Sequence, residues 1–151
     1  MDLQQLLHDR TNELLAEATE AMARTHATNY DKAGTEHIHQ RLKALYVLTI
    51  RGVKERNLGP MIAHVELIAR ERFNAGYDLW EVQTAFNVLE EAIWKMILKE
   101  VPPTELAEAL GLVSTVLGIG KDTLARRYVS LASKSKVPSL NLQSLFTGTE
   151  G

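Results

Sequence analysis

The chain has 151 residues, 45% of them hydrophobic and 24% charged, a composition typical of one globular domain with a core of its own. Its 17 Lys and Arg residues are balanced by 19 Asp and Glu residues, for a net charge of −2. This balance argues against a nucleic-acid binder, which needs a basic excess to displace phosphate counterions. Cysteine is absent, which excludes disulfides, thiolate nucleophiles and thiolate metal sites.

The chain shows no sign of a leader or of a membrane span. Its first residues lack the cationic-then-apolar order of a signal peptide. The longest uncharged interior stretch, 109–120, has twelve residues, fewer than a helix needs to cross a bilayer. We therefore expect a cytoplasmic protein without a membrane span.

The first segment predicts a helix from Asp2 to about Thr28, followed by a loop over 29–34. Asp2 is a good N-cap, and the alanine and glutamate that follow it favour helix. The apolar stripe is narrow and consists of Leu3, Leu7, Leu14, Ala18 and Met22.

A second helix is predicted to begin at Thr35, whose hydroxyl suits an N-cap. Residues 44–50 are apolar on nearly every side of such a helix, which indicates a place at the centre of the fold. A strand is the rival interpretation of this stretch. It is rejected because the chain offers no second strand-like run for pairing.

Two further helices have clear ends. Gly59-Pro60 begins the third, since proline suits a first helical position, and Gly76 is placed for a left-handed cap after its last turn. Asp78 and Glu81 have the spacing of a capping box, which predicts the start of the fourth helix. That helix must end before Pro102 and Pro103.

The last helical region is predicted to begin with Thr104 as its cap. Gly118 and Gly120 cost about 2 kcal/mol against alanine within a helix, so a kink or break is expected there, with Asp122 capping the continuation. Residues 134–151 are expected to form a loosely ordered, flexible tail. The fold class is therefore all-α, a single helical bundle of five or six helices within residues 1–133.

Catalytic and metal-binding patterns are absent from the sequence. It contains no Gly-x-Ser-x-Gly motif, and no two of its five histidines are three or four residues apart, the spacing typical of helical metal sites. Residues 118–123 resemble a phosphate loop only faintly, because Thr115 stands where such a loop needs glycine. We expect neither a catalytic site nor a cofactor or metal.

His64 lies at the edge of an apolar stripe and has three interpretations. A histidine at the boundary of the core is the default. The alternatives are a globin-like pocket in which His64 binds haem or another small molecule, and a histidine phosphotransfer domain. Against phosphotransfer, the Lys and Gly usual after such a histidine are replaced by 66–68, Glu-Leu-Ile.

Trp80 and Trp94 lie off the main apolar row of the fourth helix. Together with position 87 they are spaced at intervals of seven residues and form a separate row. Core packing against a second helix is the default interpretation, and a dimer interface is the alternative. Gly111, Thr115 and Gly118 give the fifth helix a smooth flank on which another helix could approach closely.

The run from Ala69 to Val82, continued by 85–89 and 93–94, resembles the N-terminal sensor domains of RsbR/RsbRD-type bacterial stress-signalling regulators, the co-antagonists of RsbT. The likeness covers residues 30–133 and follows a pattern of Arg72, Gly76 four residues later, an amphipathic helix, and a closing helix that ends near Tyr128. It implies an all-helical, dimeric, non-enzymatic domain with a globin-like arrangement and no haem. No catalytic residues come with the family.

The leading hypothesis is a cytoplasmic signalling domain that senses a ligand or partner protein and acts as a homodimer. Arg72, Gly76, Trp80, Trp94, Gly118 and Tyr128 are the candidate interface or pocket residues. Relatives continue into a phosphorylated STAS domain or another output module, so the chain is either a stand-alone regulator or the sensor part of a longer protein.

Overall fold

The computed structural model describes the backbone of residues 2–140 and the side chains of residues 2–134. This part of the chain is all-α, as predicted, and contains no strand. Its seven helices are α1 (Leu3–Asp9), α2 (Thr11–Arg24), α3 (Thr28–Ala33), α4 (Thr35–Glu55), α5 (Gly59–Asn74), α6 (Leu79–Glu100) and α7 (Pro103–Leu140).

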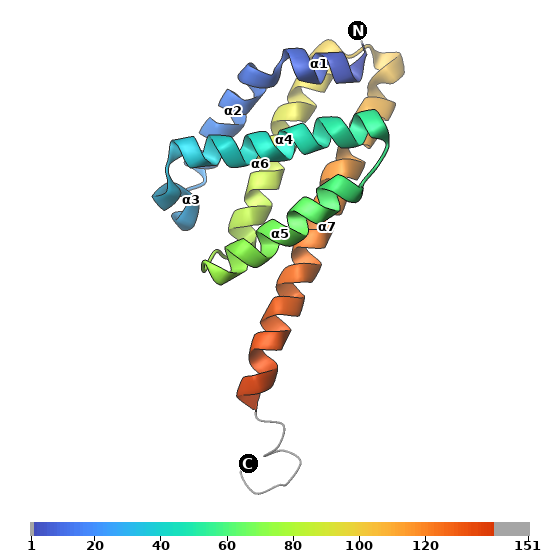
Figure 1. Ribbon diagram of the computed structural model, residues 1–151. Helices are drawn as coiled ribbons and strands as arrows, with labels where there is room; N and C mark the ends of the chain where they lie inside the picture. Colours follow the sequence, from blue (N-terminus) through green and yellow to red (C-terminus); the bar gives the residue numbers. More distant parts are fainter. Residues whose placement is uncertain (1, 141–151) are drawn as a thin grey trace, which may run out of the picture.

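The helices pack as two crossed layers (Figure 1). Helices α6 and α7 run antiparallel, and α4 and α5 cross in front of them. Helix α4 contacts all six other helices, which is the central position that its apolar middle predicts. The second half of α7 extends beyond the rest of the bundle (Figure 1).

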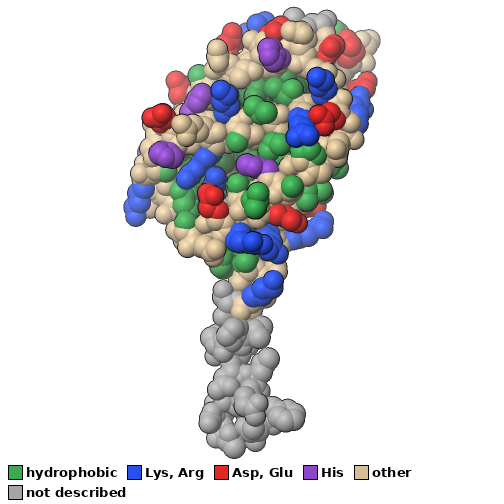
Figure 2. Space-filling view, in the orientation of Figure 1, with side chains coloured by type: hydrophobic (Ala, Val, Ile, Leu, Met, Phe, Trp, Pro, Cys, Tyr) green, Lys and Arg blue, Asp and Glu red, His purple; other side chains and the backbone are tan. Residues whose placement is uncertain are grey.

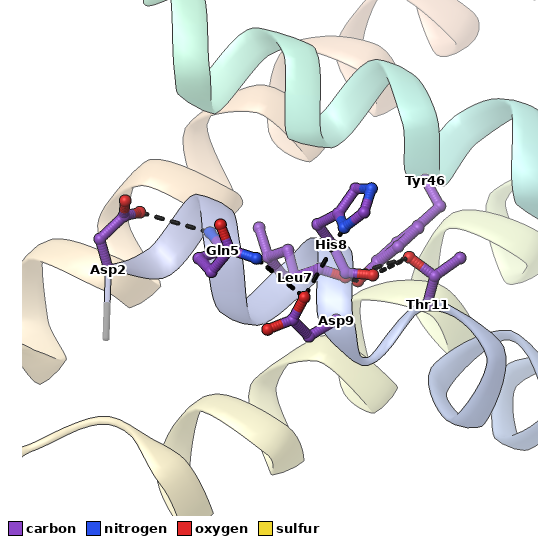
Figure 3. Close-up of polar contacts among 7 residues, drawn as sticks. All are labelled: Asp2, Gln5, Leu7, His8, Asp9, Thr11 and Tyr46. Carbon is purple, nitrogen blue, oxygen red and sulfur yellow. Dashed lines mark hydrogen bonds and ion pairs between the residues drawn. The ribbon is translucent and has the colours of Figure 1, made fainter.

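The single helix expected from Asp2 to about Thr28 is wrong, because the chain turns at Arg10 and divides into α1 and α2. The turn leaves the carbonyls of Leu7 and His8 in need of donors. The Thr11 hydroxyl lies 3.2 Å from the first and 2.8 Å from the second. The Tyr46 hydroxyl of α4 also donates to the Leu7 carbonyl (Figure 3). Side-chain hydroxyls thus replace the backbone amides as donors. The bond from Tyr46 is long-range, so no local sequence signal predicts it.

We expect Tyr46→Phe to lower the free energy of unfolding by about 1–2 kcal/mol, because it removes a buried donor and keeps the ring. Urea unfolding measures this effect. Thr49→Val is the matched control, since the Thr49 hydroxyl only donates back to the Leu45 carbonyl of its own helix. Equal losses in the two variants would contradict this role for the Tyr46 hydroxyl.

The loop expected over 29–34 is also wrong, since 28–33 form the short helix α3. Tyr30 of this helix is fully buried, and the packing of its ring outweighs the turn preference of the neighbouring residues. Gly34, with a φ of +94°, separates α3 from α4. Gly34 rather than Thr35 is therefore the N-cap of α4, and Thr35 is its first helical residue.

The ends of α5 and α6 agree with the prediction. Gly76 has a φ of +86°, and the amides of Gly76 and Tyr77 donate to carbonyls of the last turn of α5, as in a Schellman motif. Asp78 and Glu81 form the predicted capping box at the start of α6. These signals come from neighbouring residues, so the sequence predicts the turn between α5 and α6.

Of the kink or break expected at Gly118–Gly120, the break is wrong, because α7 is continuous from Pro103 to Leu140. A Cβ at Gly120 would lie 2.7 Å from Phe86 of α6, so this glycine allows close packing. Asp122 pairs with Arg126 instead of capping a new helix, and Thr104 lies inside the first turn of α7. Helix α7 overlaps the expected tail at 134–140, and the rest of that tail, 141–151, lies outside the described residues.

Candidate functional site

A small cavity of about 160 Å³ lies between α4, α5 and α6, with α3 at one end. Half of its ten lining residues are aliphatic, and the polar half includes two arginines. The lining residues are Tyr30, Gln40, Arg41, Ala44, Leu45, His64, Ile68, Arg72, Val82 and Ala85. A hollow of similar size between α2 and α6 differs because it contains charges of both signs, some of them paired, as Arg10 is with Glu100 at 3.1 Å.

Arg72 is the most deeply buried cation of this cavity, with 6% of its surface exposed. Its Nη1 donates to the Tyr30 hydroxyl at 3.0 Å. Its Nε has no hydrogen-bond acceptor within the described part of the chain. The nearest carboxylate is that of Glu71, 3.6 Å from Nε on a largely exposed side chain. Arg72 thus keeps a buried charge with little compensation, which is costly in a protein interior.

Arg41 brings a second guanidinium to the same aromatic pair. Its Nη1 donates to the Tyr77 hydroxyl at 2.9 Å. The rings of Tyr30 and Tyr77 pack edge to face with centroids 5.4 Å apart. The Arg41 guanidinium carbon lies 5.3 Å from each centroid, and that of Arg72 lies 5.9 Å from each. The rings stabilise both cations through their π faces without neutralising them.

Tyr128 joins α7 to this aromatic cluster. Its hydroxyl donates to the Tyr77 carbonyl at 3.0 Å, and its ring packs edge to face on Phe73. Burial raises the pKa of Tyr128 to about 12, so the hydroxyl stays a donor at neutral pH. The cavity wall is therefore connected to the helix that leaves the bundle.

Glu81 fixes the position of α3, which supplies Tyr30. Its two carboxylate oxygens accept hydrogen bonds from the backbone and side-chain amides of Asn29, each at 2.8 Å, and from the Asp78 amide at 2.9 Å. Burial alone would raise the pKa of Glu81, but these hydrogen bonds and Lys32 outweigh it and lower the pKa. The carboxylate is therefore ionised at neutral pH.

His64 is half-buried in the cavity wall on α5. Its pKa is lowered by burial first and by the Arg72 charge second, with a smaller opposing effect of Glu71. The imidazole is therefore neutral at pH 7 and adds no charge beside Arg72. No cluster of three His, Asp or Glu side chains that could hold a metal occurs among the described residues.

The structure separates the sequence-predicted site residues into two groups. Arg72 lines the cavity, with Gly76 and Tyr128 close to the same aromatic cluster. Trp80 and Trp94 lie on the outer face of α6 with 48% and 40% of their surface exposed, so their default placement in the core is wrong. Gly118 has open space around the position of a Cβ.

Sequence reasoning missed Tyr30, Arg41 and Tyr77. Tyr30 and Tyr77 stand in stretches that contain turn-forming residues, and Arg41 is one of several cations on α4. The only available signal was the aromatic character of the two tyrosines between helices, which does not reveal that the two positions meet. These partners are joined by tertiary packing, and the bond between Arg41 and Tyr77 links residues 36 positions apart.

Buried polar groups that converge on a small cavity in an all-helical bundle are typical of a binding or regulatory domain. The sequence model of the RsbT co-antagonist protein rsbRD N-terminal domain matches residues 11–130. The chain belongs to this family, whose members are stress-signalling regulator domains. This confirms the resemblance found in the sequence.

Two other comparisons gave no match. No curated protein and no solved structure is significantly similar to the chain. In the described residues, none of the helices has the length and apolar character that a membrane crossing requires.

Proposed function

We propose that this chain is a cytoplasmic, non-enzymatic sensor domain of a stress-signalling regulator and that it acts as a homodimer. Family membership supports the signalling role. The parent protein of the family is a co-antagonist of RsbT, so the partner of this chain would be an RsbT-like protein or an attached output module. A globin-like arrangement of the helices is part of the proposal.

The observation that carries the dimer is the exposed aromatic row on α6. Trp80 and Trp94 are two of the six large hydrophobic residues most exposed in the described chain, and Leu98 follows one turn after Trp94. Tryptophan is enriched at the centres of protein interfaces because its large ring buries much apolar surface. Two such rings left in water favour a face that a second subunit covers.

Helix α7 offers the adjoining half of that face. Lys121 of α7 binds Glu90 at 2.8 Å and approaches Asn87 at 3.3 Å, next to the tryptophan row. On the same helix, Gly111 and Gly118 have open space around their Cβ positions. A helix of a second subunit could therefore approach the backbone of α7 closely beside the tryptophans.

Helix α7 also gives the sensor a route to its partner. The helix packs on α5 and α6 and then extends from the bundle (Figure 1). Lys and Arg side chains gather where it emerges (Figure 2). Through Tyr128, a rearrangement of the cavity wall would change how α7 is held. Coupling between two sites requires an element whose position depends on a distant site. Helix α7 would be such an element.

Sedimentation velocity at micromolar concentrations tests the dimer. We expect the wild type to sediment as a dimer, and Trp94→Lys to raise the dissociation constant at least tenfold because a charge replaces an apolar contact. Leu67→Lys is the control, since Leu67 is 67% exposed and lies on α5, outside the tryptophan row of α6. A monomeric wild type, or a Trp94→Lys dimer as tight as the wild type, would reject the proposal.

The haem alternative is less well supported. The cavity beside His64 has about 160 Å³, a size that suits a benzene-sized molecule, and a porphyrin is several times larger. Phosphotransfer through His64 is likewise not favoured, because the imidazole is half-buried in the cavity wall instead of projecting into solvent.

A further inference from the structure

We propose that the cavity between α4, α5 and α6 binds a small organic monocarboxylate with a compact apolar body, and that Arg72 and Arg41 hold its carboxylate. The inference rests on the sensing role proposed above and names the chemical class of the ligand.

The first argument is the positive charge of the site. Arg72 is more than nine-tenths buried, and the Tyr30 hydroxyl is its one hydrogen-bond acceptor among the described residues. The nearest carboxylate to Arg72 is that of the largely exposed Glu71, 3.6 Å from Nε, and Arg41, which lines the same cavity, has no carboxylate partner among the described residues. Buried guanidinium groups normally meet carboxylates or phosphates. A bound anion would place a negative charge next to both guanidiniums inside the cavity.

The second argument is the character of the remaining wall. Apart from the arginines, Tyr30, Gln40 and His64, it consists of aliphatic side chains, namely Ala44, Leu45, Ile68, Val82 and Ala85. A cavity of about 160 Å³ is close in volume to engineered apolar cavities that take up benzene. Inorganic phosphate would leave such a wall without contacts, whereas an aromatic or branched aliphatic carboxylate fills it. The planar carboxylate also matches the fork of a guanidinium.

The third argument is that the chain itself stabilises the Arg72 charge only weakly. Among the described residues the Arg72 side chain makes one hydrogen bond, its Nε has no hydrogen-bond acceptor, and its ion pair with the largely exposed Glu71 spans 3.6 Å. A residue such as methionine would fill the same space without a buried charge, and such replacements are often neutral or stabilising. The charge therefore fits a ligand better than it fits a structural role.

Binding would also reach α7. A carboxylate between the two guanidiniums competes with the hydroxyls of Tyr30 and Tyr77 for their N–H groups. Tyr77 is held by α7, because its carbonyl accepts from the Tyr128 hydroxyl. A ligand that shifts the tyrosine pair thus acts directly on the contact between the cavity and the extending helix.

The test uses benzoate as the probe, with benzyl alcohol as its neutral counterpart and inorganic phosphate as an anion without an apolar body. Heteronuclear NMR titration of the full chain measures the three dissociation constants. We expect saturable shifts around the cavity with benzoate, and binding of benzyl alcohol and phosphate at least tenfold weaker. Equal binding of benzoate and benzyl alcohol, tighter binding of phosphate, or no saturable shift with benzoate would overturn the proposal.

Two variants locate the binding. Arg72→Met should weaken benzoate at least tenfold while the helical content and thermal midpoint stay at or above those of the wild type. Arg70→Met, on the exposed side of the same helix, should leave binding unchanged. If Arg72→Met unfolds the domain, the third argument is wrong, and Arg41→Met then tests the binding from α4. Unchanged affinity for benzoate in a folded Arg72 or Arg41 variant would exclude these arginines as the groups that hold the carboxylate.

His64 gives an independent readout of occupancy. Burial and then the charge of Arg72 lower its pKa, so a carboxylate bound beside Arg72 should raise the His64 pKa, as followed through its ring protons. These experiments distinguish a failure of the ligand proposal from a failure of the dimer proposal. If the chain is a monomer that binds benzoate, only the dimer proposal is rejected. If it is a dimer that does not bind benzoate, only this ligand class is rejected.

Discussion

Replacing Glu81 by glutamine is expected to destabilise the domain by about 2–4 kcal/mol at pH 7. The Glu81 side chain is 1% exposed and accepts three hydrogen bonds, two from Asn29 and one from Asp78. Glutamine keeps one acceptor oxygen and places an NH₂ group against N–H donors. Since these bonds hold α3 against α6, their loss also loosens Tyr30 in the cavity wall.

The same carboxylate predicts a pH dependence. The pKa of Glu81 in the folded chain is below its ordinary value of 4.5, so the unfolded chain binds the proton more tightly. The stabilisation is therefore complete above pH 4.5 and is lost as the pH falls through the lower, folded-state pKa. Glu81→Gln should reduce this loss of stability between pH 5 and pH 3.

Urea unfolding of both proteins at pH 7, 5 and 3 measures the two effects. Glu66→Gln is the control, because Glu66 is exposed on α5 and its substitution should change stability by less than about 0.5 kcal/mol. A Glu81→Gln protein as stable as the wild type at pH 7 would show that the carboxylate does not hold α3.

Gly52→Leu is expected to cost about 3 kcal/mol, because α4 and α7 cross at this glycine without room for a side chain. A Cβ at Gly52 would lie 2.8 Å and 3.0 Å from the two methyl groups of Val116. Val116 is buried and β-branched, so it cannot turn aside easily. The smaller change Gly52→Ala should cost about 1–2 kcal/mol by the same clash.

A double-mutant cycle separates this clash from other effects. In a Val116→Ala background the methyl groups are gone, so Gly52→Ala should become neutral or stabilising through its better helix propensity. Gly111→Ala on α7, where a Cβ meets open space, should stabilise by up to about 1 kcal/mol. Additive losses at Gly52 and Val116 would contradict close packing of the two helices.

The sequence was most informative where a structure depends on neighbouring residues. Pro60, Gly76 and the Asp78–Glu81 pair locate the ends of α5 and α6 because each signal acts within one helical turn. The sequence was misleading where distant residues decide. The turn at Arg10 depends on Tyr46 of α4, and Gly120 serves a contact with Phe86 where a break was expected.

The candidate site follows the same rule. Arg72, Gly76 and Tyr128 were marked by the family pattern, which relates positions in one stretch and in the closing helix. Tyr30 and Arg41 were not marked, because their meeting with Arg72 depends on the packing of α3 and α4 over α5. The two arginines and two tyrosines have no characteristic spacing in the sequence. Only the fold brings them together.

The most direct test of the proposed dimer uses the chain's own fluorescence. Its two tryptophans, Trp80 and Trp94, both lie on the proposed interface. Light scattering and tryptophan emission are recorded together along a dilution series. We expect the emission to shift to longer wavelength as the particle mass falls from dimer to monomer, because separation exposes both rings to water. A mass that halves without any shift, or a monomer at every concentration, would contradict the account.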